Sequence, residues 1–133
     1  MIHRKVWLLD SKGTRIQSLA QLYDGAITLI INDACVTQIS GAGGDYFESL
    51  IKIRENLEAR DWKILCNGAR VDVYPSRMSR QMSMGLKAYT LKLGVQASLR
   101  DLVDILDEAE LEKIGTIVEQ INNYRLWVSS LGE

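Results

Sequence analysis

Histidine and cysteine, which often serve as general bases, nucleophiles or metal ligands, are scarce in this chain of 133 residues. The only histidine is His3, near the start, where a general base would lack a rigid mount. The two cysteines, Cys35 and Cys66, lie in apolar, strand-like surroundings and form no CxxC pair. We therefore expect buried free thiols, with no disulfide, no metal, no cofactor and no nucleophile that has an identifiable base.

Six carboxylates form an acidic run that would suit either a divalent cation or a solvated helix face. They are Asp101, Asp104, Asp107, Glu108, Glu110 and Glu112. Oxygen-ligand sites outside the EF-hand have no tight linear pattern, so the run alone is a weak magnesium signal. Acids in the first turn of a helix oppose the positive end of its dipole. We expect these acids at the start of the last helix and facing water.

The segment from Cys66 to Gly85 has the least ordinary composition of the chain. It combines three arginines, three methionines and three serines with the only proline. Guanidinium groups beside hydroxyls suit a phosphate or a carboxylate, and methionines suit an adaptable apolar contact. The candidate binding surface comprises Arg70, Tyr74, Ser76, Arg77, Met78, Arg80 and Met82. The alternative interpretation is that these arginines pair with the acidic C-terminal region and that the methionines fill gaps in the core.

The same segment resembles the signature of a group of small, uncharacterised bacterial proteins. The matching residues read GAR-x-x-VYPS-x-MSR-x-M from Gly68 to Met82, followed by Gly85, Ala88 and Tyr89. The stretches 45–48 and 102–105 also match, so the resemblance covers most of residues 45–131. Where that group is expected to have glycine after Ser76, this chain has Arg77. The resemblance implies a bacterial protein, and it brings no established activity.

The net charge of −1 hides an uneven distribution. Residues 70–100 carry six basic side chains and one acid, whereas residues 101–133 carry eight acids and two basic side chains. This asymmetry is typical of an anion-binding surface, and equally of two oppositely charged faces that meet inside the fold. The pI of about 5.9 and the aromatic content of 7% disfavour a dedicated nucleic-acid binder.

The length and the composition indicate one globular domain over residues 1–133. Hydrophobic residues make up 47% of the chain and charged residues 25%, which is typical of a folded protein. The longest apolar run is far shorter than the roughly 20 residues of a membrane span, and no export signal is evident. We expect a cytoplasmic protein away from the membrane, and the oligomeric state stays open.

The first 40 residues predict a four-strand antiparallel meander. The strands are expected around residues 6–9, 14–22, 26–31 and 35–39, with turn residues between them. The third is apolar on both faces, as a central strand should be. The following stretch, Gly41 to Gly44, is expected to be a flexible connection.

A helix over 45–60 follows, because Asp45 and Glu48 have capping-box spacing and apolar residues recur at helical intervals. The polar side chains of this helix, Arg54 among them, are expected on its solvent side.

The second half predicts shorter and less regular elements. Strands are expected at 62–66, 71–74 and 87–93, and a short helix at 77–83 behind a Ser76 cap. Residues 98–107 favour a helix, although Leu102 to Leu106 also suits a buried strand. The last helix is expected at 109–131, with Val118 and Val128 in its apolar stripe. The expected fold class is α+β, an antiparallel meander sheet with two main amphipathic helices, about 45–60 and 109–131, packed on it.

Three functions are compatible with these features. The first is a non-catalytic protein-interaction module of the immunity or regulatory kind, which uses the segment 70–85. The second is an anion or nucleic-acid binder that uses the basic residues of the same segment. The third is an enzyme with a carboxylate-based or Cys66-based site, and the lack of an activating partner makes it the weakest. We expect a protein partner.

Overall fold

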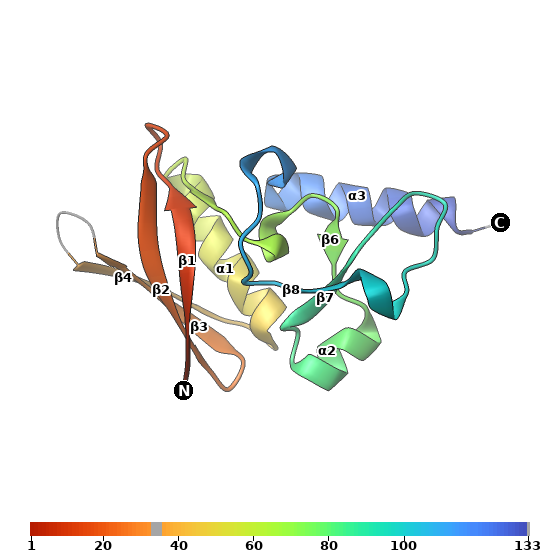
Figure 1. Cartoon of the computed structure of the whole chain (residues 1–133), viewed down its shortest axis with the longest axis horizontal. Helices are drawn as coiled ribbons and strands as arrows, with labels where there is room; N and C mark the ends of the chain where they lie inside the picture. Colours follow the sequence, from red (N-terminus) through yellow and green to blue (C-terminus); the bar gives the residue numbers. More distant parts are fainter. Residues whose placement is uncertain (33–35, 133) are drawn as a thin grey trace.

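The structure is a computed structural model that describes residues 1–32 and 36–132. Cys35 lies outside these residues, so the expectation for its thiol stays a prediction. The described chain forms two antiparallel sheets and three α-helices, and the fold is α+β as expected (Figure 1). None of the described helices is long and apolar enough to cross a membrane.

The first sheet has five strands in the order β4-β3-β2-β1-β5. Its strands are β1 (Ile2–Leu9), β2 (Arg15–Tyr23), β3 (Ala26–Asn32), β4 (Val36–Ala42) and β5 (Lys63–Ile64). The predicted meander is confirmed, because each of the first four strands pairs antiparallel with its neighbour in sequence. The strand expected at 62–66 is reduced to the two residues of β5, which pair with the end of β1.

The helix α1 (Tyr46–Ala59) covers one face of this sheet and confirms the prediction of a helix at 45–60. The Asp45 carboxylate accepts a hydrogen bond from the Glu48 backbone N–H at 2.9 Å, as an N-cap does. The stretch from Gly41 to Gly44 is not the flexible connection that was expected, because β4 extends through Gly41 to Ala42. A side chain at Gly41 would collide with the backbone carbonyl of Ser49, so glycine lets α1 lie close to the strand.

The second sheet is small, with the order β6-β7-β8. It contains β6 (Val73–Tyr74), β7 (Lys87–Thr90) and β8 (Leu102–Asp104), and the helix α2 (Arg77–Ser83) connects β6 to β7. The predicted helix at 77–83 is confirmed, and Arg77 adopts no left-handed conformation there. Two short 3₁₀ helices, η1 (Asn67–Ala69) and η2 (Leu99–Asp101), complete this half.

Two predictions for this second sheet are wrong. Residues 98–107 form η2 and β8 and not the favoured α-helix, because the Ser98 cap supports only one 3₁₀ turn before β8 pairs with β7. The alternative of a strand is confirmed for Leu102–Asp104. The strand expected at 87–93 ends at Thr90, and Leu93 is exposed.

The last helix, α3 (Ile117–Ser130), begins eight residues later than the 109–131 prediction. The chain before it makes one 3₁₀ turn, η3 (Leu111–Lys113), and Thr116 then starts the helix with a reciprocal capping box to Glu119. The helix contacts β6 and α1 (Figure 1). Val118 and Val128 are exposed, so the predicted apolar stripe is not the buried face of this helix.

A buried polar contact joins α1 to α3. Arg54 is only 2% exposed, and its guanidinium donates to the Gln120 side-chain oxygen at 2.6 Å and to the carbonyls of Gly68 and Gly115. Gln120, 1% exposed, donates to the carbonyls of Gly68, Arg70 and Val73. The prediction that Arg54 faces solvent is therefore wrong. Apart from this contact, one apolar core runs through both halves of the chain.

Candidate functional site

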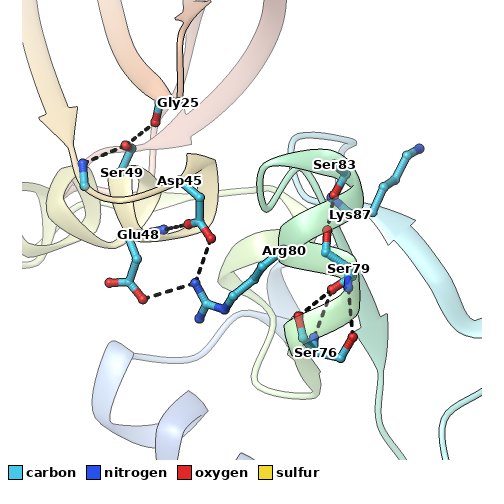
Figure 2. A network of polar contacts seen from close by, with 10 residues as sticks. Gly25, Asp45, Glu48, Ser49, Ser76, Ser79, Arg80, Ser83 and Lys87 are labelled. Atoms are coloured by element: carbon cyan, nitrogen blue, oxygen red, sulfur yellow. Dashed lines mark hydrogen bonds and ion pairs between the residues drawn. The ribbon is translucent and has the colours of Figure 1, made fainter.

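The short helix α2 is fixed at both ends, although it has only seven residues. At its start, Ser76 and Ser79 exchange side-chain and backbone hydrogen bonds at 2.9 and 3.0 Å (Figure 2). At its end, the Ser83 hydroxyl accepts from the Lys87 N–H at 3.0 Å, and the Met84 carbonyl accepts from the Tyr46 N–H at 2.7 Å. The second contact ties α2 to the first turn of α1. Such a short helix is ordered here by caps and tertiary contacts and not by its own propensity.

Arg80 forms the main side-chain contact between α2 and α1. Its guanidinium lies 2.9 Å from the Asp45 carboxylate and 3.3 Å from that of Glu48 (Figure 2). It also lies over the rings of Phe47 and Tyr74, at 5.3 and 5.9 Å from their centroids. The reciprocal half of the predicted Asp45–Glu48 capping box is absent from the described contacts, and the Glu48 carboxylate faces Arg80 instead. Arg80 is therefore a structural residue.

Arg70 and Tyr74 are also held inside the fold. The Arg70 guanidinium forms a two-pronged contact with the Asp72 carboxylate, with both distances 2.8 Å. The Tyr74 ring stacks on Tyr124 of α3 at 4.1 Å between centroids and meets Phe47 edge-on at 5.3 Å. Burial raises the pKa of the Tyr74 hydroxyl, and the nearby Arg80 opposes this shift.

The alternative interpretation of the arginines is wrong about their partners. Arg70 and Arg80 pair with Asp72, Asp45 and Glu48, none of which belongs to the acidic C-terminal region.

The acidic run is not placed as predicted either, because α3 begins after it. Asp104 and Asp107 lie 2.9 and 2.6 Å from the Arg4 guanidinium, and Glu108 lies 2.9 Å from that of Arg15. The run therefore attaches the second half of the chain to the first sheet.

Arg77, Met78 and Met82 differ from the rest of the candidate set, because their side chains face solvent. Met78 is 60% exposed and Met82 is 79% exposed, and they share one side of α2 at a spacing of four residues. Met84, which the sequence analysis did not select, follows in a left-handed conformation and is 42% exposed. We call these four residues, Arg77, Met78, Met82 and Met84, the methionine surface. The alternative that the methionines fill core gaps is wrong.

Met84 had a recognisable signal in the sequence. It is the third methionine of the segment and directly precedes Gly85, at the place where a helix commonly ends in left-handed residues. Gly85 itself has φ +81°, and a side chain there would approach the Asp45 carboxyl carbon to 2.7 Å. The close approach of α2 to the start of α1 thus depends on glycine at this position.

The residues considered for nucleophilic chemistry are poorly suited to it. Cys66 is fully buried, and desolvation raises the pKa of its thiol to about 11, so the thiolate is scarce at neutral pH. His3 is not at a loose end of the chain, because it lies within β1 opposite Gln21. It is exposed there.

A pocket of about 270 Å³ opens between α1 and the start of α3. The buried Arg54 forms part of its wall, with Glu58, Asp61 and Glu119 among the other lining residues. Two of these acids already cap the start of α3. The Glu58 carboxylate accepts a hydrogen bond from the Ile117 N–H, and the Glu119 carboxylate accepts one from the Thr116 N–H, both at 2.8 Å. Arg54, Glu58 and Glu119 thus already serve the fold itself. No family model matches the chain, and no curated protein matches it in sequence.

Proposed function

We propose that this chain is a non-catalytic protein-binding module, of the immunity or regulatory kind, that docks its partner on the methionine surface. The observation that carries this proposal is the exposure of Met78 and Met82 on a helix that is otherwise fixed by hydrogen bonds, and of Met84 directly after it. Isolated apolar side chains on a surface are ordinary, whereas neighbouring large ones mark interaction sites. We therefore place the proposed binding site at α2.

The chemistry of the surface favours an apolar groove on another protein. Methionine is unbranched and polarisable, and it adapts to irregular apolar contacts. The backbone beneath it is already ordered by the Ser76–Ser79 caps and the Arg80 ion pairs, so binding costs little backbone entropy. Arg77 is exposed beside Met78 and would suit an acidic residue at the rim of the groove. The proposed partner is a protein with an apolar groove and an acidic rim.

The two other functions receive less support. A nucleic-acid site would use Arg70, Arg77 and Arg80 against phosphates, but Arg70 and Arg80 already face carboxylates within 3 Å. An enzyme based on Cys66 would need a thiolate that the burial of this residue disfavours. A free, buried Cys66 suits a reducing compartment, and we propose that the protein works in the cytoplasm.

Site-specific photo-crosslinking in the native host tests this proposal. A photoreactive amino acid is introduced at position 82, and a matched protein carries it at position 99, because Leu99 is 75% exposed and lies outside the methionine surface. We expect a discrete adduct of one cellular protein from position 82 and none from position 99. Equal adducts from both positions, or none from position 82, would contradict the proposal.

A further inference from the structure

The two edges of the first sheet are protected to very different degrees. At one edge, β5 has only two residues and includes Lys63. At the other edge, β4 has seven residues, VTQISGA, with no charged residue and no proline. Natural sheets guard their edges by shortness, charge, proline or bulges, because unpaired backbone groups attract other strands. β4 is thus a long edge strand without such protection.

The outer backbone groups of β4 are not used within the part of the chain that the structure describes. The strand bonds to β3 in a regular antiparallel register from Val36 to Ala42. No residue of β4 makes a backbone–backbone hydrogen bond outside the sheet with another described residue. In such a pair, alternate residues point their N–H and C=O away from the neighbouring strand. These groups are available to a further strand.

The first half of β4 is the accessible half. Near its end, a side chain at Gly41 would approach the Lys52 side chain of α1 to 3.1 Å, so a lysine lies beside this part of the strand. The beginning of β4 projects away from α1 (Figure 1). Val36 is 65% exposed, and Gln38 and Ser40 are also exposed. A pairing strand would therefore meet residues 36–40.

We propose that two copies of this chain pair antiparallel through residues 36–40 of β4, with Gln38 opposite Gln38 of the second copy. A two-fold axis places a strand antiparallel to itself, and two-fold dimers are the commonest oligomers. The absence of charged residues from β4 favours a second copy of this chain as the pairing strand. Any charged residue would lie close to its own copy near the axis, where like charges repel, and an uncharged strand avoids this cost.

The chosen register also suits the side chains. A glutamine amide both donates and accepts, so two Gln38 side chains can bond to each other across the axis. Val36 would then lie opposite Ser40 of the second copy on the same face of the sheet.

At the distant edge, β5 pairs only with Leu8 and Leu9 of β1, and the rest of β1 carries the charged residues Arg4 and Lys5, which guard that edge. The assembly therefore closes at two copies and does not grow into a filament. Pairing of five residues is less than a standard interface, and the dimer is expected to be weak and reversible.

Sedimentation equilibrium tests this pairing at chain concentrations from roughly 5 to roughly 500 µM, a range suited to weak interfaces. The wild-type weight-average mass should rise from 15.0 kDa toward twice that value. Gln38→Lys and Gln38→Glu should each weaken self-association by about fivefold or more, because each places two like charges at the axis. An equimolar mixture of the two variants should restore it at low salt. Gln17→Lys makes the same change on an exposed residue of the inner strand β2 and should leave the mass curve unchanged.

Thermal melts establish that all three variants stay folded, as expected for exposed positions. A wild-type mass of one chain at every concentration overturns the proposal. The outer edge of β4 would then be open to a strand from another protein. A dimer that persists in both Gln38 variants overturns it as well, and places the contact elsewhere. Equal weakening by Gln17→Lys would show a general charge effect and would also overturn it.

Discussion

The buried contact between Arg54 and Gln120 makes a sharp prediction for stability. Gln120→Leu keeps a similar volume but removes the oxygen that accepts from the Arg54 guanidinium at 2.6 Å. It also removes the donor to three buried or half-buried carbonyls. A hydrogen bond to a charged group contributes about 1.5–3 kcal/mol, and an orphaned buried polar group costs about 1–3 kcal/mol. Two effects limit this loss of stability. The leucine side chain gains from apolar burial, and the Gly68 carbonyl keeps its hydrogen bond from the Arg54 guanidinium.

We expect Gln120→Leu to lower the free energy of unfolding by about 3 kcal/mol, within the range for breaking a buried charged contact. Urea unfolding followed by circular dichroism measures this change, provided that the m-value is unaltered. The control is Asn122→Leu, which makes a similar change at an exposed position of the same helix and should alter the free energy by less than about 0.5 kcal/mol. A loss below about 1 kcal/mol for Gln120→Leu would refute the structural role assigned to this contact.

Three further predictions follow from individual side chains. Arg80→Ala should lower the Tm by about 5 °C because it breaks the link from α2 to α1, whereas Arg77→Ala should shift it by less than about 1 °C; scanning calorimetry compares them. In a Cys35→Ser background, Cys66 should react with a thiol reagent only when the protein unfolds. As the pH rises from about 9 to 11, the raised pKa of Cys66 should lower the free energy of unfolding of the wild type by up to about 2–3 kcal/mol relative to that of Cys66→Ala. Gly85→Ala should destabilise the protein by about 1–3 kcal/mol in the same urea assay, from its positive φ and the contact with the N-cap carboxylate of α1.

The sign of the Cys66 effect follows from the protonation states. Burial favours the neutral thiol, so the folded protein holds its proton to a higher pH than the unfolded chain does. Between the unfolded and folded pKa values the folded state binds more protons, and stability falls as the pH rises. A stability difference between the wild type and Cys66→Ala that stays constant over this window would contradict the assigned burial.

Elements with local signals could be predicted from the sequence. The apolar stripe of α1 is recognisable from spacing alone, and its residues Leu50, Ile53 and Leu57 are buried. The helix α2 was predicted with its bounds, because Ser76 is a strong cap after the turn at Pro75. In each case the deciding interactions join residues only three or four positions apart.

Features that depend on distant partners could not be predicted. The buried face of α3 includes Gln120, whose partner Arg54 lies 66 residues away, so the apolar residues of this helix indicated the wrong side. The start of α3 was missed because the acidic residues before it suit a helix equally well, yet three of them pair with arginines of β1 and β2. For the same reason, the candidate binding residues fall into two groups, those held inside the fold and those that face solvent. Only the tertiary contacts distinguish the structural Arg80 from the exposed Arg77.

Affinity for the crosslinked partner is the most direct test of the methionine surface. Once the protein captured from position 82 is purified, calorimetric titration compares the wild type with Met78→Ser/Met82→Ser and with the control Leu99→Ser. Truncating two apolar contacts at a binding site should weaken the affinity at least tenfold, and Leu99→Ser should leave it within about twofold. A double variant that binds as tightly as the wild type, with its fold intact, would contradict the assignment of α2 as the functional surface.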